Sequence, residues 1–405
     1  MKPGDSTTWY AASTNSVFRS TNSGDSFMPV IIPLFRGAGR IVLDVTPANP
    51  EYVYFLSSRN NSSRDFYGLY RSVNSGVSFT KMGETENILE SNQAWYDLAL
   101  AVSDTDENIA FVGCLNIWKT TDGGDNWSNV LNANGILDLK MKPNDPTTWY
   151  AVTNSTFYKS TNSGSSFSSV NLPNLVNSRR LTMGVTSANN GYVYVVSAAN
   201  SAGFPFNGLY KSTNSGSSFI RTNATTLYQG EEQAWYDFAL AVSSNNAETL
   251  YVGVVNLHKS TNGGNSFSRI NSWDNPNQGS YTHADIHYLN FIDGKFFAGT
   301  DGGVFVSTDE AVNFTDLTKN LAISQFYRIS VSPQDYNSVV GGLQDNGGYG
   351  YNNGTWKNYH GADGMEGVVD PNNPDKYYGF IQFGAQLHIT ENGGLSRTNV
   401  VGPPG

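Results

Sequence analysis

The sequence predicts an all-β protein, a β-propeller built from about nine blade-sized units of four strands each. Three observations lead to this prediction. A short turn motif recurs along the chain, the first two thirds of the chain are a duplication at an offset of 140 residues, and alternating segments rich in β-branched and aromatic residues flank the motifs. Repeats spaced roughly 40–50 residues apart are typical of propeller blades. A lone blade leaves its faces and edges unpaired, so the units must pack side by side.

The turn motif first appears as STNSGDSF at residues 20–27. Its consensus is Ser/Thr-x-Asn/Asp-x-Gly-x-x-aromatic, and each good copy follows a short strand-like run. The Asn or Asp side chain accepts backbone N–H bonds, Gly takes a positive φ, and the aromatic residue anchors the turn to the core. Further copies lie at 72–79, 120–127, 160–167, 212–219 and 260–267, with looser ones at 307–314 and 390–397.

This motif resembles the Asp-box, or BNR repeat, of sialidases, sortilin-type receptors and xyloglucanase-like propellers. The resemblance covers nearly the whole chain and implies the propeller fold. The resemblance does not imply an activity. Sialidases use three arginines, and although Arg40, Arg180 and Arg328 lie at or near the start of inner strands, the first two are equivalent positions of the duplication.

The duplication divides the chain into two regions. Residues 1–280 form a six-blade region in which 1–138 repeat as 141–278, and QAWYD at 93–97 recurs at 233–237. Residues 281–405 form three divergent blades of the same or a second propeller. The first blade lacks its inner strand, and one inner strand is expected at Trp95–Val102. Because the chain starts in the middle of a repeat, we expect it to be a fragment of a longer secreted precursor.

Composition limits the classes of partner and the compartment. Charged residues make up 14% of the chain and aromatic residues 13%, and the net charge is −10. An acidic chain with scattered basic residues argues against a nucleic-acid partner, and no apolar run is long enough for membrane insertion. A surface built from Asn, Ser, Thr and Gly is typical of secreted β-proteins, so we expect an extracellular or cell-surface location in a bacterium. The single cysteine, Cys114, is expected to be a buried small hydrophobe.

Propeller connectivity separates the loops by face. With the strands of a blade lettered A to D from the inside outward, the turn motifs join C to D on one face, whereas the B–C and D–A connections lie on the opposite face, where propellers normally bind. Two long B–C loops, 58–68 and 198–208, share length but differ in residues, as recognition loops often do; the alternative is that they are variable solvated loops. The predicted ligand-binding residues on this face are Arg59, Arg64, Tyr67, Phe204, Phe206, Trp273, Tyr281 and Tyr349.

A metal site is one interpretation of His283-Ala284-Asp285-Ile286-His287. If this segment is extended, the alternation of a strand places His283, Asp285 and His287 on one face, where two imidazoles and a carboxylate could hold a divalent metal. The alternative is a polar lining of the central channel, since Asp97 and Asp237 occupy the matching position without histidines. No other cofactor is expected.

Acidic loop residues near this segment are candidate catalytic groups. They occur in successive units, and a glycosidase needs two carboxylates, one as acid and one as base or nucleophile. The alternative is that Asp-Gly and Asn-Gly pairs are turn residues. The candidates are Asp285, Asp301, Asp345, Asp363 and Glu366.

The segments at 283–287, 301–305 and 342–348 also resemble large Asp-box proteins of Bacteroidetes-type bacteria, many of them secreted through the type IX route. Together these observations favour a secreted or cell-surface propeller that binds a protein or a polysaccharide through its B–C/D–A face. Two alternatives stay open: an endoglucanase-like glycoside hydrolase using the carboxylates of the last three blades, and a structural unit of a large adhesin or surface filament.

Overall fold

The structure is a computed structural model, and it describes residues 1–405 except 6, 14, 34, 84–86, 91–93, 95–97, 134, 293, 319–324, 353 and 403–405. The fold is all-β: one three-stranded and eight four-stranded antiparallel sheets follow one another along the chain, as in a propeller. Each sheet is a simple meander in chain order. The first sheet has three strands and no inner strand, as predicted.

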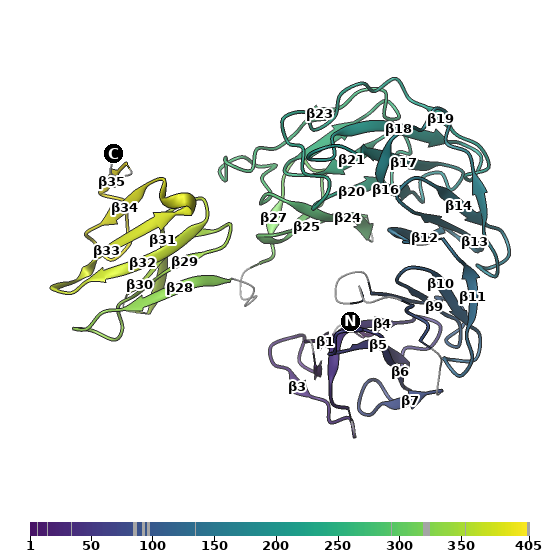
Figure 1. Ribbon diagram of the computed structural model, residues 1–405, viewed down its shortest axis with the longest axis horizontal. Coiled ribbons are helices and arrows are strands. Elements are labelled where there is room, and N and C mark those ends of the chain that lie inside the picture. Colours follow the sequence, from purple (N-terminus) through teal and green to yellow (C-terminus); the bar gives the residue numbers. More distant parts are fainter. Residues whose placement is uncertain are drawn as a thin grey trace. The chain divides into compact units, whose positions relative to one another are not determined.

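The chain divides into two compact units. Unit 1 comprises Met1–Val254 and His258–Arg269, and unit 2 comprises Val255–Leu257 and Ile270–Gly405. In Figure 1 the sheets of unit 1 follow one another from purple to teal, and strands of neighbouring sheets contact each other, as β4 with β8 and β16 with β20.

The strands of the first six sheets are β1 (Trp9–Ala12), β2 (Val17–Ser20) and β3 (Met28–Pro29); β4 (Ala38–Val45), β5 (Val53–Arg59), β6 (Phe66–Ser72) and β7 (Thr80–Met82); β8 (Ala99–Val102), β9 (Ala110–Gly113), β10 (Ile117–Thr120) and β11 (Ser128–Leu131); β12 (Asp138–Lys142), β13 (Asp145–Val152), β14 (Phe157–Ser160) and β15 (Ser168–Val170); β16 (Ser178–Val185), β17 (Val193–Ala199), β18 (Phe206–Ser212) and β19 (Ile220–Arg221); and β20 (Ala239–Val242), β21 (Leu250–Gly253), β22 (Leu257–Ser260) and β23 (Ser268–Arg269).

The last three sheets consist of β24 (Ile286–Ile292), β25 (Lys295–Thr300), β26 (Gly303–Ser307) and β27 (Thr315–Asp316); β28 (Phe326–Val331), β29 (Val339–Leu343), β30 (Gly347–Asn352) and β31 (Thr355–His360); and β32 (Gly364–Asp370), β33 (Asn373–Ile381), β34 (Leu387–Thr390) and β35 (Asn399–Val401). A 3-10 turn, η1 (Gln382–Gly384), follows β33.

The turn motif forms the hydrogen bonds that its residue types predict. In the copy between β18 and β19, the Ser212 hydroxyl accepts from the Gly216 N–H at 2.9 Å, and the Asn214 side-chain oxygen accepts from the Ser218 N–H at 3.0 Å. Gly216 has φ +70°, which a glycine adopts without strain, and Phe219 is buried. Asn therefore performs the role that Asp has in the Asp-box consensus.

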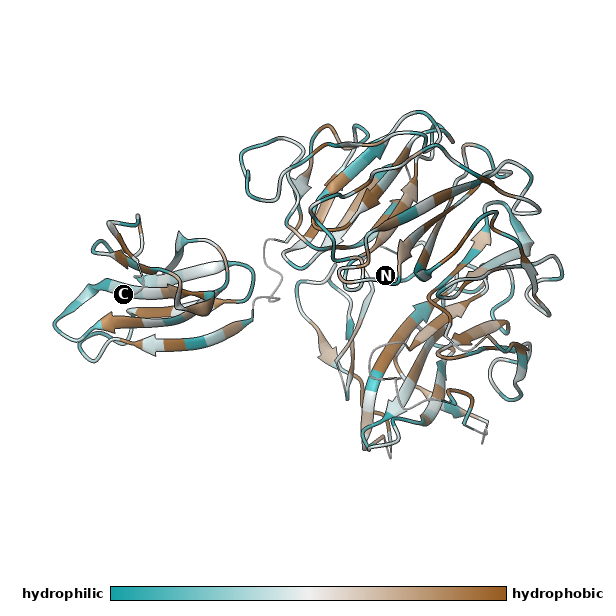
Figure 2. Cartoon of the chain, turned by 45° about the horizontal axis from the view of Figure 1, so that its top comes forward, coloured by the Kyte–Doolittle hydropathy of each residue, from teal (hydrophilic) through white to brown (hydrophobic). Residues whose placement is uncertain are grey.

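Neighbouring sheets of unit 1 are joined by bonds that repeat at the offset of 140. The Tyr54 hydroxyl donates to the Glu107 carbonyl at 2.7 Å, and its equivalent Tyr194 donates to the Ala247 carbonyl at 2.8 Å. Both tyrosines are fully buried, and a buried hydroxyl is stable only when it is hydrogen-bonded. Hydrophobic residues gather on the strands and hydrophilic ones in the turns (Figure 2). Cys114 is buried in this core, as predicted.

Three predicted boundaries differ from the structure. The hairpin loops expected at 58–68 and 198–208 are shorter, because pairing continues to Ser58–Phe66 and Ala198–Phe206 and leaves 60–65 and 200–205 as connections. The inner strand expected at 95–102 covers Ala99–Val102, and 95–97 lie outside the described residues. The strand expected from Asp285 begins at Ile286.

Candidate functional site

Four of the five candidate carboxylates come together in unit 2. Asp285 precedes β24, Asp301 lies between β25 and β26, Asp345 lies between β29 and β30, and Asp363 precedes β32. The Asp301 N–H donates to the Asp285 carbonyl at 3.2 Å, and the Asp345 N–H donates to the Asp363 carboxylate at 2.7 Å. We call these four residues the carboxylate cluster. Its members come from B–C and D–A connections, the loop face predicted to carry function.

The carboxylate cluster changes the acidity of Asp345. Its pKa is raised to about 6 by partial burial, then by the charge of Asp363 and a side-chain hydrogen bond to it, and then by the charges of Asp301 and Asp285. Asp345 can therefore donate a hydrogen bond when it is protonated and accept one when it is ionised.

Two histidines border the carboxylate cluster. A ring nitrogen of His283 lies 3.0 Å from the Asp345 carbonyl oxygen, and His287 lies 2.7 Å from a carboxylate oxygen of Asp301. The predicted metal-binding face of His283, Asp285 and His287 is not formed, because Asp285 has φ +62° and interrupts the extended run. Over the part of the chain that the structure describes, no group of three or more His, Cys, Asp or Glu is arranged to hold a metal ion.

Strained backbone and close-packed glycines build this site. Asp285, Asp345 and Ala362 all have left-handed backbone, with φ of +62°, +56° and +63°. A Cβ on Gly364 would collide with the backbone of Gly347, so the loops before β30 and β32 approach each other backbone to backbone. Non-glycine residues with positive φ are uncommon and cluster at functional sites.

The fifth candidate, Glu366, has a different environment. It is exposed and forms an ion pair of 3.3 Å with Arg328. Tyr327 is partly exposed, and its pKa is raised by burial and then by the charges of Asp363 and Asp345, so this phenol borders the carboxylate cluster. The structure thus separates Glu366 from the four aspartates and adds an aromatic ring beside them.

The three predicted aromatic ligands of unit 2 have different environments. Tyr281 packs edge-on against Phe305 with ring centroids 6.0 Å apart, and burial raises its pKa. Burial also raises the pKa of Tyr349. Trp273 is half-exposed, and its backbone N–H donates to the side-chain oxygen of Asn256 at 2.8 Å.

The predicted ligand-binding residues of unit 1 contact other residues of the same unit. The Arg59 guanidinium lies 5.4 Å from the ring centre of Tyr67, whose hydroxyl accepts from the Arg36 N–H at 3.0 Å. Arg59 also pairs with Asp65 at 3.4 Å. Arg64 donates to the Asn60 side chain at 3.0 Å. These contacts hold the first hairpin connection together.

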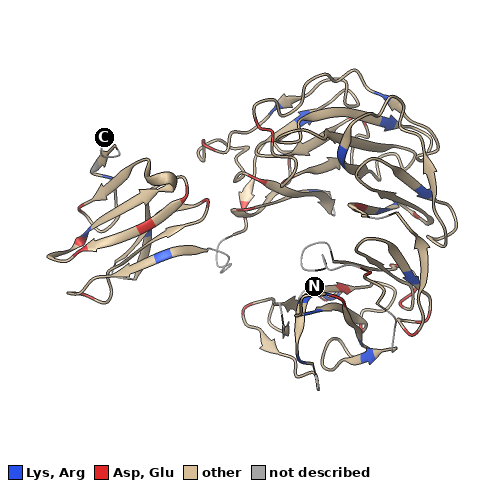
Figure 3. Cartoon of the chain, in the orientation of Figure 1, with Lys and Arg blue, Asp and Glu red and all other residues tan. Residues whose placement is uncertain are grey.

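In the second hairpin the aromatic residues pack in the same way. Phe204 has φ +56°, and its carbonyl accepts from the Tyr228 hydroxyl at 3.3 Å. Phe206 meets the Tyr228 ring at 6.3 Å. Lys and Arg are spread over the strands of each unit (Figure 3).

One exposed aromatic pair was not among the predicted site residues. Trp235 and Tyr236 precede β20 in a turn, with 60% and 40% of their surfaces exposed. The equivalent residues 95–97 were assigned to a strand from their alternation. The repetition of the same pentapeptide in both halves was the signal that could have identified this pair.

A scan against family models and a search of curated proteins found no match to the sequence. Solved structures similar to this chain include a GH74 enzyme from Niastella koreensis (16% identity, TM-score 0.47, covering 97% of this chain and 77% of that one) and YCF48 from Cyanidioschyzon merolae (13%, 0.48, 76% and 92%). PorZ, a bacterial surface component of the type-IX secretion system of Porphyromonas gingivalis, is 11% identical with a TM-score of 0.48, and this chain spans about half of its length. Similarities at this level of identity and TM-score do not indicate an activity.

Within the described residues, the structure has no helix of the length and apolarity that crossing a membrane requires.

Proposed function

We propose that the protein is a secreted or cell-surface β-propeller that binds a polysaccharide at the carboxylate cluster of unit 2. The observation that carries this proposal is the environment of Asp345, whose pKa is raised to about 6 by partial burial and by the charges of neighbouring aspartates, and whose backbone is left-handed. Perturbed acidity and backbone strain in the same residue favour a functional role.

The chemistry of the carboxylate cluster suits a ligand rich in hydroxyl groups. Each sugar hydroxyl can donate one hydrogen bond and accept another, and ionised carboxylates accept such bonds. Asp345 adds a donor when it is protonated, and bonds to charged groups are about twice as strong as neutral ones. The partly exposed ring of Tyr327 adds an apolar face beside these groups.

Glycoside hydrolysis is a second candidate, favoured by the same raised pKa. A glycosidase general acid must be protonated near the working pH, and its partner carboxylate lies roughly 5–10 Å away. Asp345, whose pKa is raised to about 6, would act as the acid. Asp301 or Asp285 would be the base or nucleophile.

We further propose membership of the Asp-box propellers and an extracellular setting. The turn motif and its hydrogen bonds support the first proposal, as in the Ser212–Gly216 bond. The low charge and the polar surface support the second. These proposals are compatible with three more specific roles: a sortilin-like receptor, a part of an adhesin or surface filament, and a type IX secretion substrate.

Binding can be tested by affinity electrophoresis in gels containing galactomannan, hydroxyethyl cellulose, pullulan or alginate. We expect at least one of them to retard the protein, and the double variant Asp345→Asn/Asp363→Asn to weaken this retardation about tenfold or more. The matched control is Asp145→Asn, at a turn of unit 1. Unchanged retardation of the double variant would remove the carboxylate cluster from binding.

The hydrolase candidate is tested on the same polysaccharides by measuring new reducing ends. We expect turnover, if present, to disappear in Asp285→Asn and in Asp345→Asn. No turnover by the unaltered protein over pH 4–8 would leave the binding function alone.

A further inference from the structure

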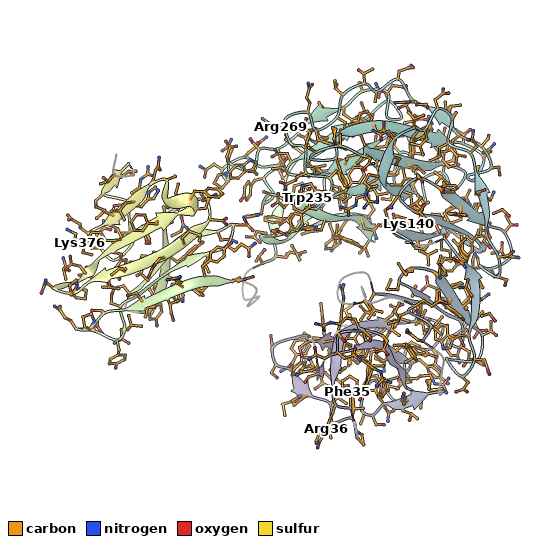
Figure 4. The ribbon with its side chains drawn as sticks, in the orientation of Figure 1. Phe35, Arg36, Lys140, Trp235, Arg269 and Lys376 are labelled. Carbon is orange, nitrogen blue, oxygen red and sulfur yellow. The ribbon has the colours of Figure 1, made fainter. Side chains whose placement is uncertain are left out.

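Trp235 and Tyr236 in unit 1 form an exposed pair of aromatic rings (Figure 4, which labels Trp235). Their ring centroids are 5.5 Å apart and their planes are inclined by 40°. They are therefore neighbouring, non-coplanar faces open to solvent. Large aromatic side chains are normally buried because each removes about 150–250 Å² of surface from water.

The turn that carries these rings is held by specific hydrogen bonds. One guanidinium nitrogen of Arg180 donates to the carbonyls of Ala234 at 2.9 Å and Tyr236 at 3.2 Å. The Tyr236 N–H donates to the Gln233 carbonyl at 2.8 Å, and the Gln233 amide donates to the buried Asp237 at 3.2 Å. These hydrogen bonds fix the backbone of the turn, and both rings are exposed. A binding site that is already ordered lowers the entropic cost of binding.

The two halves of the duplication retain this turn in sequence. QAWYD at 233–237 is identical to 93–97, which lie outside the described residues, whereas the five preceding residues are YQGEE in one copy and ILESN in the other. Burial explains why Ala234 and Asp237 are retained. It does not explain Trp235 and Tyr236, because both are exposed.

We infer that Trp235 and Tyr236 form a stacking platform for the sugar rings of a neutral polysaccharide. The apolar faces of pyranose rings match aromatic faces, and exposed polar groups beside the rings supply partners for hydroxyls. The nearby Glu232 is exposed, and its carboxylate accepts from the Gly230 N–H at 3.0 Å. With this exposed carboxylate beside the rings and a net charge of −10, an anionic polysaccharide would be repelled.

This platform does not rest on the carboxylate cluster of unit 2, and its test separates the two sites. The full chain and its Trp235→Ala and Trp235→Phe variants are run in gels containing hydroxyethyl cellulose, galactomannan or alginate. Tyr336→Ala is the matched control, because Tyr336 is an aromatic residue with 82% of its surface exposed and lies between β28 and β29, in neither proposed site. Thermal unfolding of each variant shows whether the fold is intact.

We expect a neutral polysaccharide to retard the protein, Trp235→Ala to weaken that affinity about tenfold, and Trp235→Phe to restore part of it. Tyr336→Ala should bind like the unaltered chain, and alginate should not retard the protein. The inference is overturned if no neutral polysaccharide binds, if Trp235→Ala binds like the unaltered chain, or if alginate binds equally well. Loss in Trp235→Ala with full binding in Asp345→Asn/Asp363→Asn would support the platform and refute the carboxylate cluster; the reverse result would do the opposite.

Discussion

Replacing Asp345 by asparagine is expected to stabilise the protein near neutral pH. The folded state raises the pKa of this carboxyl from its ordinary value of 3.8 to about 6, so folding makes its ionisation harder. Asparagine has nearly the same shape and carries no charge to be repelled by Asp363. A residue that lowers the stability of its own fold is typical of a functional site.

The size of the effect follows from the two pKa values. Each unit of pKa corresponds to 1.36 kcal/mol, so the difference between 3.8 and about 6 gives an upper limit of about 3 kcal/mol. Asp345 is only partly buried, and solvent screening reduces this limit. We therefore expect Asp345→Asn to raise the free energy of unfolding by about 1 kcal/mol at pH 7.5.

The pH dependence of unfolding provides an independent check that Asp345→Asn stabilises the protein. Between pH 4 and 6 the folded protein holds a proton on Asp345 that the unfolded chain has lost, so the contribution of this residue to stability falls as pH rises through this range. The gain from Asp345→Asn should therefore shrink as pH is lowered from 7.5 to 4.5, as measured by urea unfolding. A pH-independent difference, or a loss of stability at pH 7.5, would refute the reasoning.

Asp145 provides a control of opposite sign. Its carboxylate accepts from the Thr147 hydroxyl at 2.6 Å, from the Thr148 hydroxyl at 3.0 Å and from Lys142 at 3.1 Å, and these bonds hold its pKa well below the ordinary value. Asp145→Asn should lower stability at pH 7.5, with a smaller difference in acid.

Three further changes test the fold. Gly264→Ala should lower stability by about 1–3 kcal/mol, measured by urea unfolding, because Gly264 has φ +80° and a Cβ there would collide with Leu209. The contribution of His388 to stability should be lost as pH falls from 6.5 toward 4, because burial and then the charge of the stacked His360 lower the pKa of His388 to about 4; the difference in stability between the unaltered protein and His388→Phe, measured by urea unfolding, should change in this pH range. Tyr194→Phe should lower the free energy of unfolding by about 1 kcal/mol, because the partner carbonyl of its buried hydrogen bond is left unpaired.

The repeated sheets could be predicted from sequence because their signals are local. Each turn motif supplies its own bonds, as between Ser212 and Gly216, and each flanking strand shows its own alternation. The boundaries that failed depend on distant residues instead. The left-handed backbone of Asp285 ends an alternation that looked continuous, and the pairing of Ser58 with Phe66 shortens a loop that looked long.

For the candidate site, loop topology was enough to select residues but not to assign their roles. Connectivity placed Asp285, Asp301, Asp345 and Asp363 on one face, and the structure brings these four together. The raised pKa of Asp345 depends on burial and on the distance to Asp363, neither of which any spacing in the sequence contains. The separate position of Glu366 likewise depends on its pairing with Arg328.

The central claim, that the carboxylate cluster of unit 2 is the binding site, is tested most directly by hydroxyl-radical footprinting with and without the retarding polysaccharide. The account predicts that Tyr327 and His287, both exposed beside the carboxylate cluster, become protected. Phe27 lies in a turn motif between strands C and D rather than in a B–C or D–A connection, and it should keep its reactivity. Protection of Phe27 and the other turn-motif aromatics, with Tyr327 and His287 unchanged, would contradict it.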